Sequence, residues 1–86
     1  MKTVRIYTID GCPYCIELKE MLTKDNIEFV EVNVDLEENQ IEYNELNRIT
    51  KSDDVPIIRV GKNLLVPNIS FQSINEAATL TKQFLA

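Results

Sequence analysis

The chain has 86 residues, of which 44% are hydrophobic and 27% charged, and a formal net charge of -5 without any histidine. This length supports one domain, residues 1–86, because two halves would each be too small to form a stable core. The negative charge repels phosphate groups, no apolar run is long enough to span a membrane, and the first residues do not resemble a signal peptide. We therefore expect a cytoplasmic protein with no nucleic-acid or membrane partner.

The first third of the chain predicts a strand, a helix and a second strand. Residues 3–8 are β-branched and aromatic and alternate in part between polar and apolar, which indicates a strand. Residues 13–25 are good helix formers with apolar side chains at helical spacing. Asn26 suits a left-handed helix end. Residues 27–34, rich in β-branched side chains, predict the second strand.

A second helix is predicted over residues 37–50, and a loop follows it over residues 51–54. Two glutamates near the start of this helix suit the positive end of its dipole. We expect the inner face of the helix to contain Ile41, Leu46 and Ile49.

The rest of the chain predicts a hairpin and a third helix. Residues 56–60 and 64–66 flank Gly61-Lys62-Asn63, which is typical of a β-hairpin. Ser73 and Glu76 have the spacing of a capping box. The helix that they begin carries the apolar residues Ile74, Ala77, Ala78, Phe84 and Leu85.

The element order β-α-β-α-β-β-α predicts an α/β fold with a four-stranded mixed sheet and helices on its faces. A right-handed crossover makes the first two strands parallel neighbours, and the hairpin supplies an antiparallel pair.

Cys12 and Cys15 are the only cysteines, and they lie where the first strand gives way to the first helix. A disulfide across so short a loop removes little entropy from the unfolded chain, which argues against a structural role. The chain has no histidine and no second cysteine pair for a zinc site, so we expect no bound metal. Redox chemistry therefore remains as the function of the cysteine pair.

The position of Cys12 at the start of a helix predicts a reactive sulfur. Unpaired amide hydrogens and the positive end of the helix dipole stabilise a thiolate there, so we expect its pKa to lie well below the value of about 8.5 of a free thiol. Pro13 suits the first helical turn, where its missing amide hydrogen would have no partner. Cys15, one turn further in, should be less exposed. We therefore expect Cys12 to attack a substrate disulfide and Cys15 to resolve the mixed disulfide.

The tetrapeptide Cys12-Pro13-Tyr14-Cys15, the element order and the later Val55-Pro56 resemble the dithiol glutaredoxins over nearly the whole chain. The resemblance implies a thioredoxin-like fold and a cis-proline turn in which the backbone of Val55 pairs with the cysteine of glutathione. It also implies that Tyr14 packs against bound glutathione. Without the resemblance, Pro56 would simply open an edge strand and Tyr14 would be a surface aromatic.

The same resemblance implies glutathione as the reductant, no bound cofactor, and disulfide-containing proteins as substrates, a ribonucleotide reductase among them. It implies a role in electron transport and cell redox homeostasis. Glutathione carries two carboxylates, so its site needs donors or positive charge. Arg48 and Lys51 are the nearest cations and can reach round to a carboxylate, although their position favours capping or solvating the end of the second helix. In the stretch before the last helix, donors are available from Asn68, Ser70, Gln72 and Ser73, of which Ser73 also brings helix amides.

Three alternatives to a glutathione-dependent enzyme remain open. The stretch before the last helix lacks the family's glycine pair, and Asp53 and Asp54 precede Val55, which favours a thioredoxin-like reductase served by a flavoprotein. A second alternative is an iron-sulfur carrier in which two copies share a cluster through Cys12 and two glutathiones. The third is a redox-inactive adaptor, against which the intact cysteines argue. For the enzyme we expect a monomer.

Overall fold

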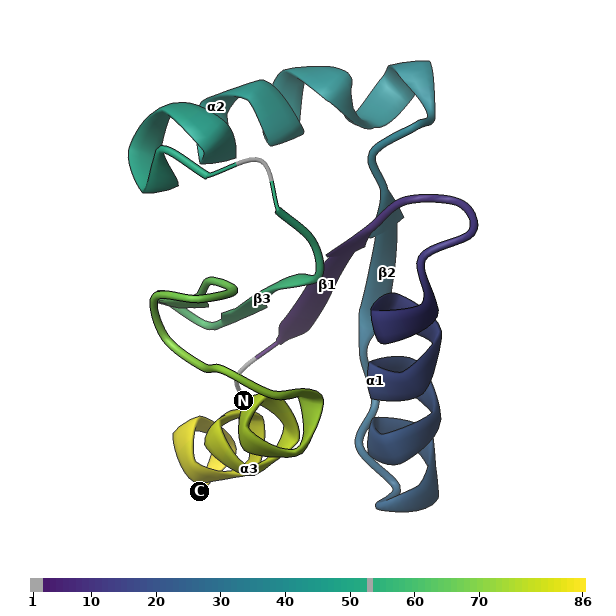
Figure 1. Ribbon diagram of the computed structural model, residues 1–86, viewed down its shortest axis with the longest axis vertical. Coiled ribbons are helices and arrows are strands. Elements are labelled where there is room, and N and C mark those ends of the chain that lie inside the picture. The colour runs from purple at the N-terminus through teal and green to yellow at the C-terminus, as the bar shows by residue number, and fades with distance from the viewer. Residues whose placement is uncertain (1–2, 53) are drawn as a thin grey trace.

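In the computed structural model, which describes residues 3–52 and 54–86, a four-stranded sheet separates one helix from two others (Figure 1). Residue 53, in the predicted loop over residues 51–54, lies outside the described residues. In chain order the elements are β1 (Val4–Thr8), α1 (Pro13–Lys24), β2 (Val30–Asn33), the short 3-10 helix η1 (Glu37–Asn39), α2 (Gln40–Thr50), β3 (Ile57–Val60), β4 (Asn63–Leu65) and α3 (Ile74–Leu85).

The sheet has the strand order β2-β1-β3-β4 and is mixed, as predicted. β1 and β2 run parallel, whereas β1 with β3 and β3 with β4 run antiparallel. The parallel pair follows from the right-handed crossover through α1, and the antiparallel pair β3–β4 is the predicted hairpin.

The second strand is shorter than predicted, and the end of α1 explains why. Asn26 adopts the predicted left-handed conformation, with φ 61°. The turn lets the amide of Ile27 donate to the carbonyl of Leu22 at 2.9 Å, so Ile27 still belongs to the helix end. Side chains of Ile27 and Phe29 pack against the core, and β2 begins only at Val30.

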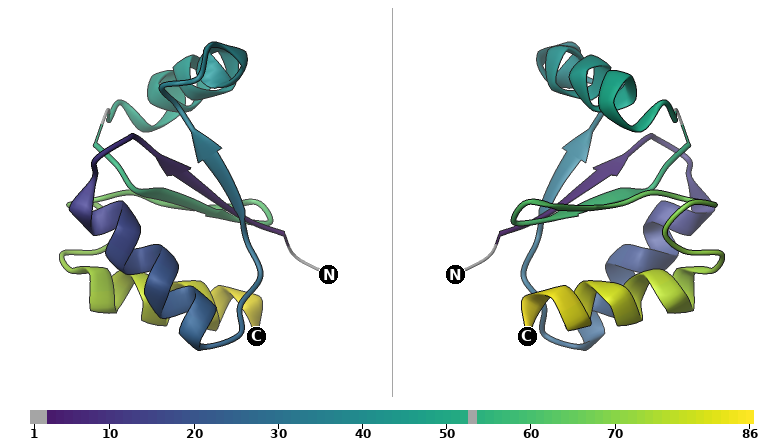
Figure 2. Two further views of the ribbon diagram at one scale, coloured as in Figure 1. Left: turned by 90° about the vertical axis from the view of Figure 1, so that its right-hand side faces the viewer. Right: turned by 90° about the vertical axis from the view of Figure 1, so that its left-hand side faces the viewer.

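The two faces of the sheet bury different residues because side chains alternate along a strand. Val4 and Ile6 of β1 and Ile58 of β3 face α1 and α3, in the larger cluster of buried residues. Tyr7 and Ile57, one position along each strand, belong to the second cluster, under α2. Figure 2 shows this layering, with α2 on one side of the sheet and α1 and α3 on the other.

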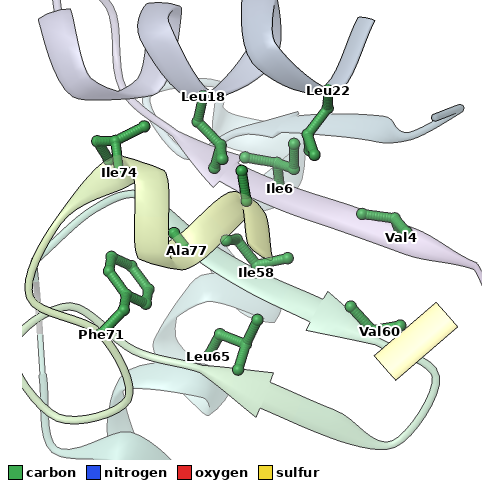
Figure 3. Close-up of a cluster of buried hydrophobic side chains, with 11 residues drawn as sticks. Val4, Ile6, Leu18, Leu22, Ile58, Val60, Leu65, Phe71, Ile74 and Ala77 are labelled. Carbon is green, nitrogen blue, oxygen red and sulfur yellow. The ribbon is translucent and has the colours of Figure 1, made fainter. Parts of the chain in front are cut away.

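The larger cluster joins α1 to the sheet. Leu18 and Leu22 of α1 point toward Ile6 in Figure 3, and Ala77 of α3 closes the cluster from the second helix. Leu18, Leu22 and Ile6 are fully buried. This packing fixes the helix whose first turn holds the cysteines.

The predicted inner face of α2 was wrong for two of its three residues. Leu46 is buried, but Ile41 is 77% exposed and Ile49 is 71% exposed. A helix turns by about 100° per residue, so Ile41 lies roughly 140° around the helix from Leu46. The face that packs on the sheet contains Glu42, Tyr43 and Leu46 instead.

A polar cluster under α2 explains why this face carries a glutamate. Glu42 accepts hydrogen bonds from the guanidinium of Arg5, at 2.9 Å for the shortest, and from the hydroxyl of Tyr7 at 2.5 Å. Burial of the Tyr7 ring, with the bond to Glu42 as a smaller cause, raises the pKa of its hydroxyl. A hydrophobic pattern cannot predict this face, because its central contact to the sheet is made by a charged residue.

A second polar cluster predicts how stability depends on pH. Glu31 accepts hydrogen bonds from the ammonium of Lys19 and the hydroxyl of Thr8, both at 2.8 Å, and these bonds, chiefly that of Lys19, lower the pKa of Glu31 from 4.5. A lowered pKa in the folded state stabilises the protein above pH 4.5, and this contribution is lost as the pH falls through the lowered value.

We expect Glu31→Gln to lower the free energy of unfolding at pH 7 by less than about 1 kcal/mol, because the ion pair is partly exposed. The difference from the wild type should vanish in strong acid, where the carboxyl is protonated in both states. Urea unfolding at the two pH values measures it, with the exposed Glu20→Gln as the control. A difference that persists in strong acid would contradict the electrostatic explanation.

Candidate active site

The first turn of α1 presents the sulfur of Cys12. Gly11, with φ 73°, makes the turn that leads from β1 into the helix. Cys12 is the N-cap, with extended backbone, and Pro13 is the first helical residue, as predicted. The sulfur of Cys12 accepts a hydrogen bond from the amide of Cys15 at 3.1 Å. Since the first turn of α1 contains no acidic residue, no carboxylate within it opposes the positive end of the helix.

Cys12 and Cys15 form a disulfide, with their Cα atoms 5.3 Å apart. This is the oxidised state of the pair. Cys12 is 7% exposed and Cys15 is 1% exposed, so the first sulfur is the more accessible of the two. The lower exposure of Cys15 is as expected from the sequence, and the order of attack stays a prediction.

A cleft of about 330 Å³ lies between the start of α1, the turn before β3 and the loop before α3. Figure 2 shows the start of α1 and the loop before α3 on the same side of the molecule. The Val55–Pro56 peptide bond is cis, as the resemblance implies. The cleft is lined by Tyr14, Asp54, Val55, Pro56, Pro67, Asn68, Phe71, Gln72, Ser73 and Ile74.

Four predicted glutathione-binding residues, Tyr14, Val55, Pro56 and Ser73, therefore come together in this cleft. Tyr14 is 62% exposed and offers an open aromatic face.

Two other predicted contacts, Ser70 and Lys51, do not line the cleft. The hydroxyl of Ser70 accepts the amide hydrogen of Val66 at 3.0 Å and so stabilises its own loop. Lys51 ends α2 in a left-handed conformation, with φ 56°, and its amide donates to the carbonyl of Asn47. Their glutathione contacts stay predictions.

The sequence interpretation missed the apolar floor of the cleft, which includes Pro67, Phe71 and Ile74. Asn68 turns the loop with a left-handed φ of 64°, and its amide donates to the carbonyl of Phe71 at 2.9 Å. This tight turn brings Phe71 under the loop, where it is buried. The dipeptide Pro67-Asn68 is a turn signal that would have predicted the fold-back.

Among residues 3–52 and 54–86, no group of three or more histidine, cysteine, aspartate or glutamate side chains could hold a metal ion. Within the same ranges, no helix is both long enough and apolar enough to cross a membrane.

Residues 4–65 match the family model described as Glutaredoxin, which covers the first helix, the cysteine pair and all four strands. The chain belongs to the glutaredoxin family. It is 36% identical over 63 residues to an uncharacterized glutaredoxin-like 8.6 kDa protein in the rubredoxin operon of Clostridium pasteurianum, covering 73% of this chain and 81% of that protein.

Solved structures show the same fold. Glutaredoxin 1 from Francisella tularensis, complexed with cacodylate, superposes with a TM-score of 0.65 at 26% identity, covering 99% of this chain and 98% of its own. A mutant of a thioredoxin-like protein superposes with a TM-score of 0.70 at 20% identity, covering 98% of this chain and all of its own. The predicted thioredoxin-like fold is thereby confirmed. For this glutaredoxin, family and cysteine pair together support thiol-disulfide oxidoreductase activity in general.

Proposed function

We propose that this glutaredoxin is a glutathione-dependent oxidoreductase that reduces protein disulfides and glutathione mixed disulfides. Cys12 is the nucleophile and Cys15 the resolving thiol. The observation that carries the proposal is the hydrogen bond from the amide of Cys15 to the sulfur of Cys12 at the N-terminus of α1. The same donor stabilises a thiolate at Cys12 when the disulfide is reduced, and the thiolate is the species that attacks.

The proposed reduction transfers two electrons in two exchanges. The Cys12 thiolate attacks one sulfur of the substrate disulfide, forms a mixed disulfide and releases the other substrate sulfur, which takes up a proton. Cys15, as a thiolate after giving its proton to solvent, attacks the sulfur of Cys12 and releases the second substrate thiol. The product is the Cys12–Cys15 disulfide found in the structure.

Glutathione returns the electrons in the proposed cycle. One glutathione thiolate attacks the Cys12–Cys15 disulfide and forms a mixed disulfide with Cys12, while Cys15 regains its thiol. A second glutathione attacks the mixed disulfide, which restores the Cys12 thiolate and yields oxidised glutathione. We place the tripeptide in the cleft, with its cysteine backbone along Val55 and its body against Tyr14. Ser73 lines the same cleft. An extended peptide suits a free backbone edge of this kind.

The proposed reaction requires no resident cofactor and only one copy of the chain, so we propose a monomer. We also propose that it acts in the cytoplasm, as expected from the sequence. Protein disulfides are its proposed substrates. A ribonucleotide reductase is the substrate class that the family resemblance suggests.

A second candidate is a thioredoxin-like reductase that receives its electrons from a flavoprotein. The observation that favours it is the charge of the cleft. Asp54 is the only charged side chain among the described residues that line it, and glutathione brings two carboxylates to the same place.

The reduction of a small glutathione mixed disulfide by the wild-type protein separates the two candidates. We expect turnover with glutathione and glutathione reductase as the electron supply, at a rate that rises with glutathione concentration. Turnover with a flavoprotein thioredoxin reductase, and none with glutathione, would instead establish the second candidate.

A further inference from the structure

The cleft that Tyr14 and Val55 line contains one acidic side chain among the described residues, Asp54. Asp54 is exposed, lines the cleft next to the cis peptide bond, and forms no ion pair with any of the residues described. The three ion pairs among the described residues involve the cations Arg5, Lys19 and Lys82. None of these cations lines the cleft. A carboxylate that is not ion-paired attracts a positively charged ligand group and repels a negatively charged one.

The start of α3, which also lines the cleft, already uses part of its donors within the chain. Helix N-termini normally bind anions through free amide hydrogens. At the start of α3, the carboxylate of Glu76 accepts the amide hydrogen of Gln72 at 2.6 Å, and the hydroxyl of Ser73 accepts that of Glu76 at 3.1 Å. The chain's own carboxylate thus occupies a donor that a ligand carboxylate would need.

The exposed aromatic ring of Tyr14 also favours a positively charged ligand group. Tyr14 lines the same cleft as Asp54 and is 62% exposed. Lysine and arginine side chains bind the faces of exposed aromatic rings while they pair with a carboxylate. Tyr14 and Asp54 therefore offer a basic side chain two favourable contacts within one cleft.

We infer that this cleft selects disulfide-bonded peptide segments that carry a lysine or arginine next to the reactive cysteine, and that Asp54 is the residue that recognises the basic side chain. The inference rests on the proposed exchange at Cys12 and specifies its protein substrates. An extended segment along Val55 places its cysteine at Cys12 and a neighbouring side chain over Asp54 and Tyr14.

Synthetic disulfide peptides that differ only in the residue beside the cysteine, lysine or glutamate, test the inference. The protein is first reduced chemically, so that the rate of peptide reduction in one turnover does not depend on glutathione. We expect the lysine peptide to react roughly fivefold faster at low salt, as one partly exposed charge contact allows. This ratio should fall toward one in Asp54→Asn and at high salt.

Glu45→Gln is the matched control, because it removes the same charge from an exposed position on α2 outside the cleft. It should keep the wild-type ratio. Equal rates for the two peptides, or an equal loss of the ratio in both variants, would overturn the inference. Failure of the wild type to reduce either peptide would overturn the proposed exchange reaction instead, so the two failures are distinguishable.

Discussion

Cys12→Ser is expected to lower thiol-disulfide exchange to the uncatalysed background, whereas Cys15→Ser should still turn over glutathione mixed disulfides. The reason is the order of attack. Serine at position 12 has no thiolate to accept the hydrogen bond from the amide of Cys15, which in this structure points at the first sulfur. Without Cys15, a second glutathione can still attack the mixed disulfide at Cys12, but the intramolecular step that releases a protein dithiol is lost.

The two variants control for each other, because both remove the same disulfide. Activity is measured on a glutathionylated peptide and on a peptide with an internal disulfide. Equal loss in both variants on both substrates would contradict the assigned roles. Reduced Cys15→Ser also isolates one thiol, whose alkylation rate should reach half its plateau well below pH 8.5, the approximate pKa of a free cysteine.

The topology could be predicted from the sequence because its signals are local. Strand and helix patterns, the turn at Gly61 and the helix end at Asn26 each depend on a few neighbouring residues, and a right-handed crossover limits the arrangements that remain. The buried face of α2 could not be predicted in this way. Ile41 and Ile49 suggest an apolar face, but both are exposed, and Glu42 makes the contact with Tyr7 of the sheet. Only the position of Arg5 and Tyr7 in the folded sheet shows why a glutamate points inward.

The candidate site, too, could be predicted only in part from the sequence. The cysteine pair is predictable, because its chemistry follows from its place at the start of one helix. The cleft joins three segments far apart in the chain, so its lining depends on how the loop before α3 folds back. Phe71 gave no signal of function, and Ser70 proved to accept the amide of Val66 within the loop rather than to line the cleft.

Leu18→Ala should lower the free energy of unfolding by about 2–5 kcal/mol. Leu18 is fully buried and packs in the cluster that joins α1 to the sheet and to α3 (Figure 3). Truncation removes apolar contacts and leaves a cavity that a close-packed neighbourhood fills only in part. Urea unfolding of both proteins with the disulfide intact measures the difference and keeps the crosslink constant.

Ile16→Ala on the same helix is the matched control, because Ile16 is 49% exposed and its truncation should cost far less. A similar loss in both variants would contradict the packing explanation, because Ile16 is half exposed and alanine favours a helix more than leucine or isoleucine does. If the Leu18→Ala effect is the larger, the anchoring of α1 depends on its buried face. Cys12 is the N-cap of that helix and Tyr14 in its first turn lines the cleft, so the same packing positions both the sulfur and this side of the cleft.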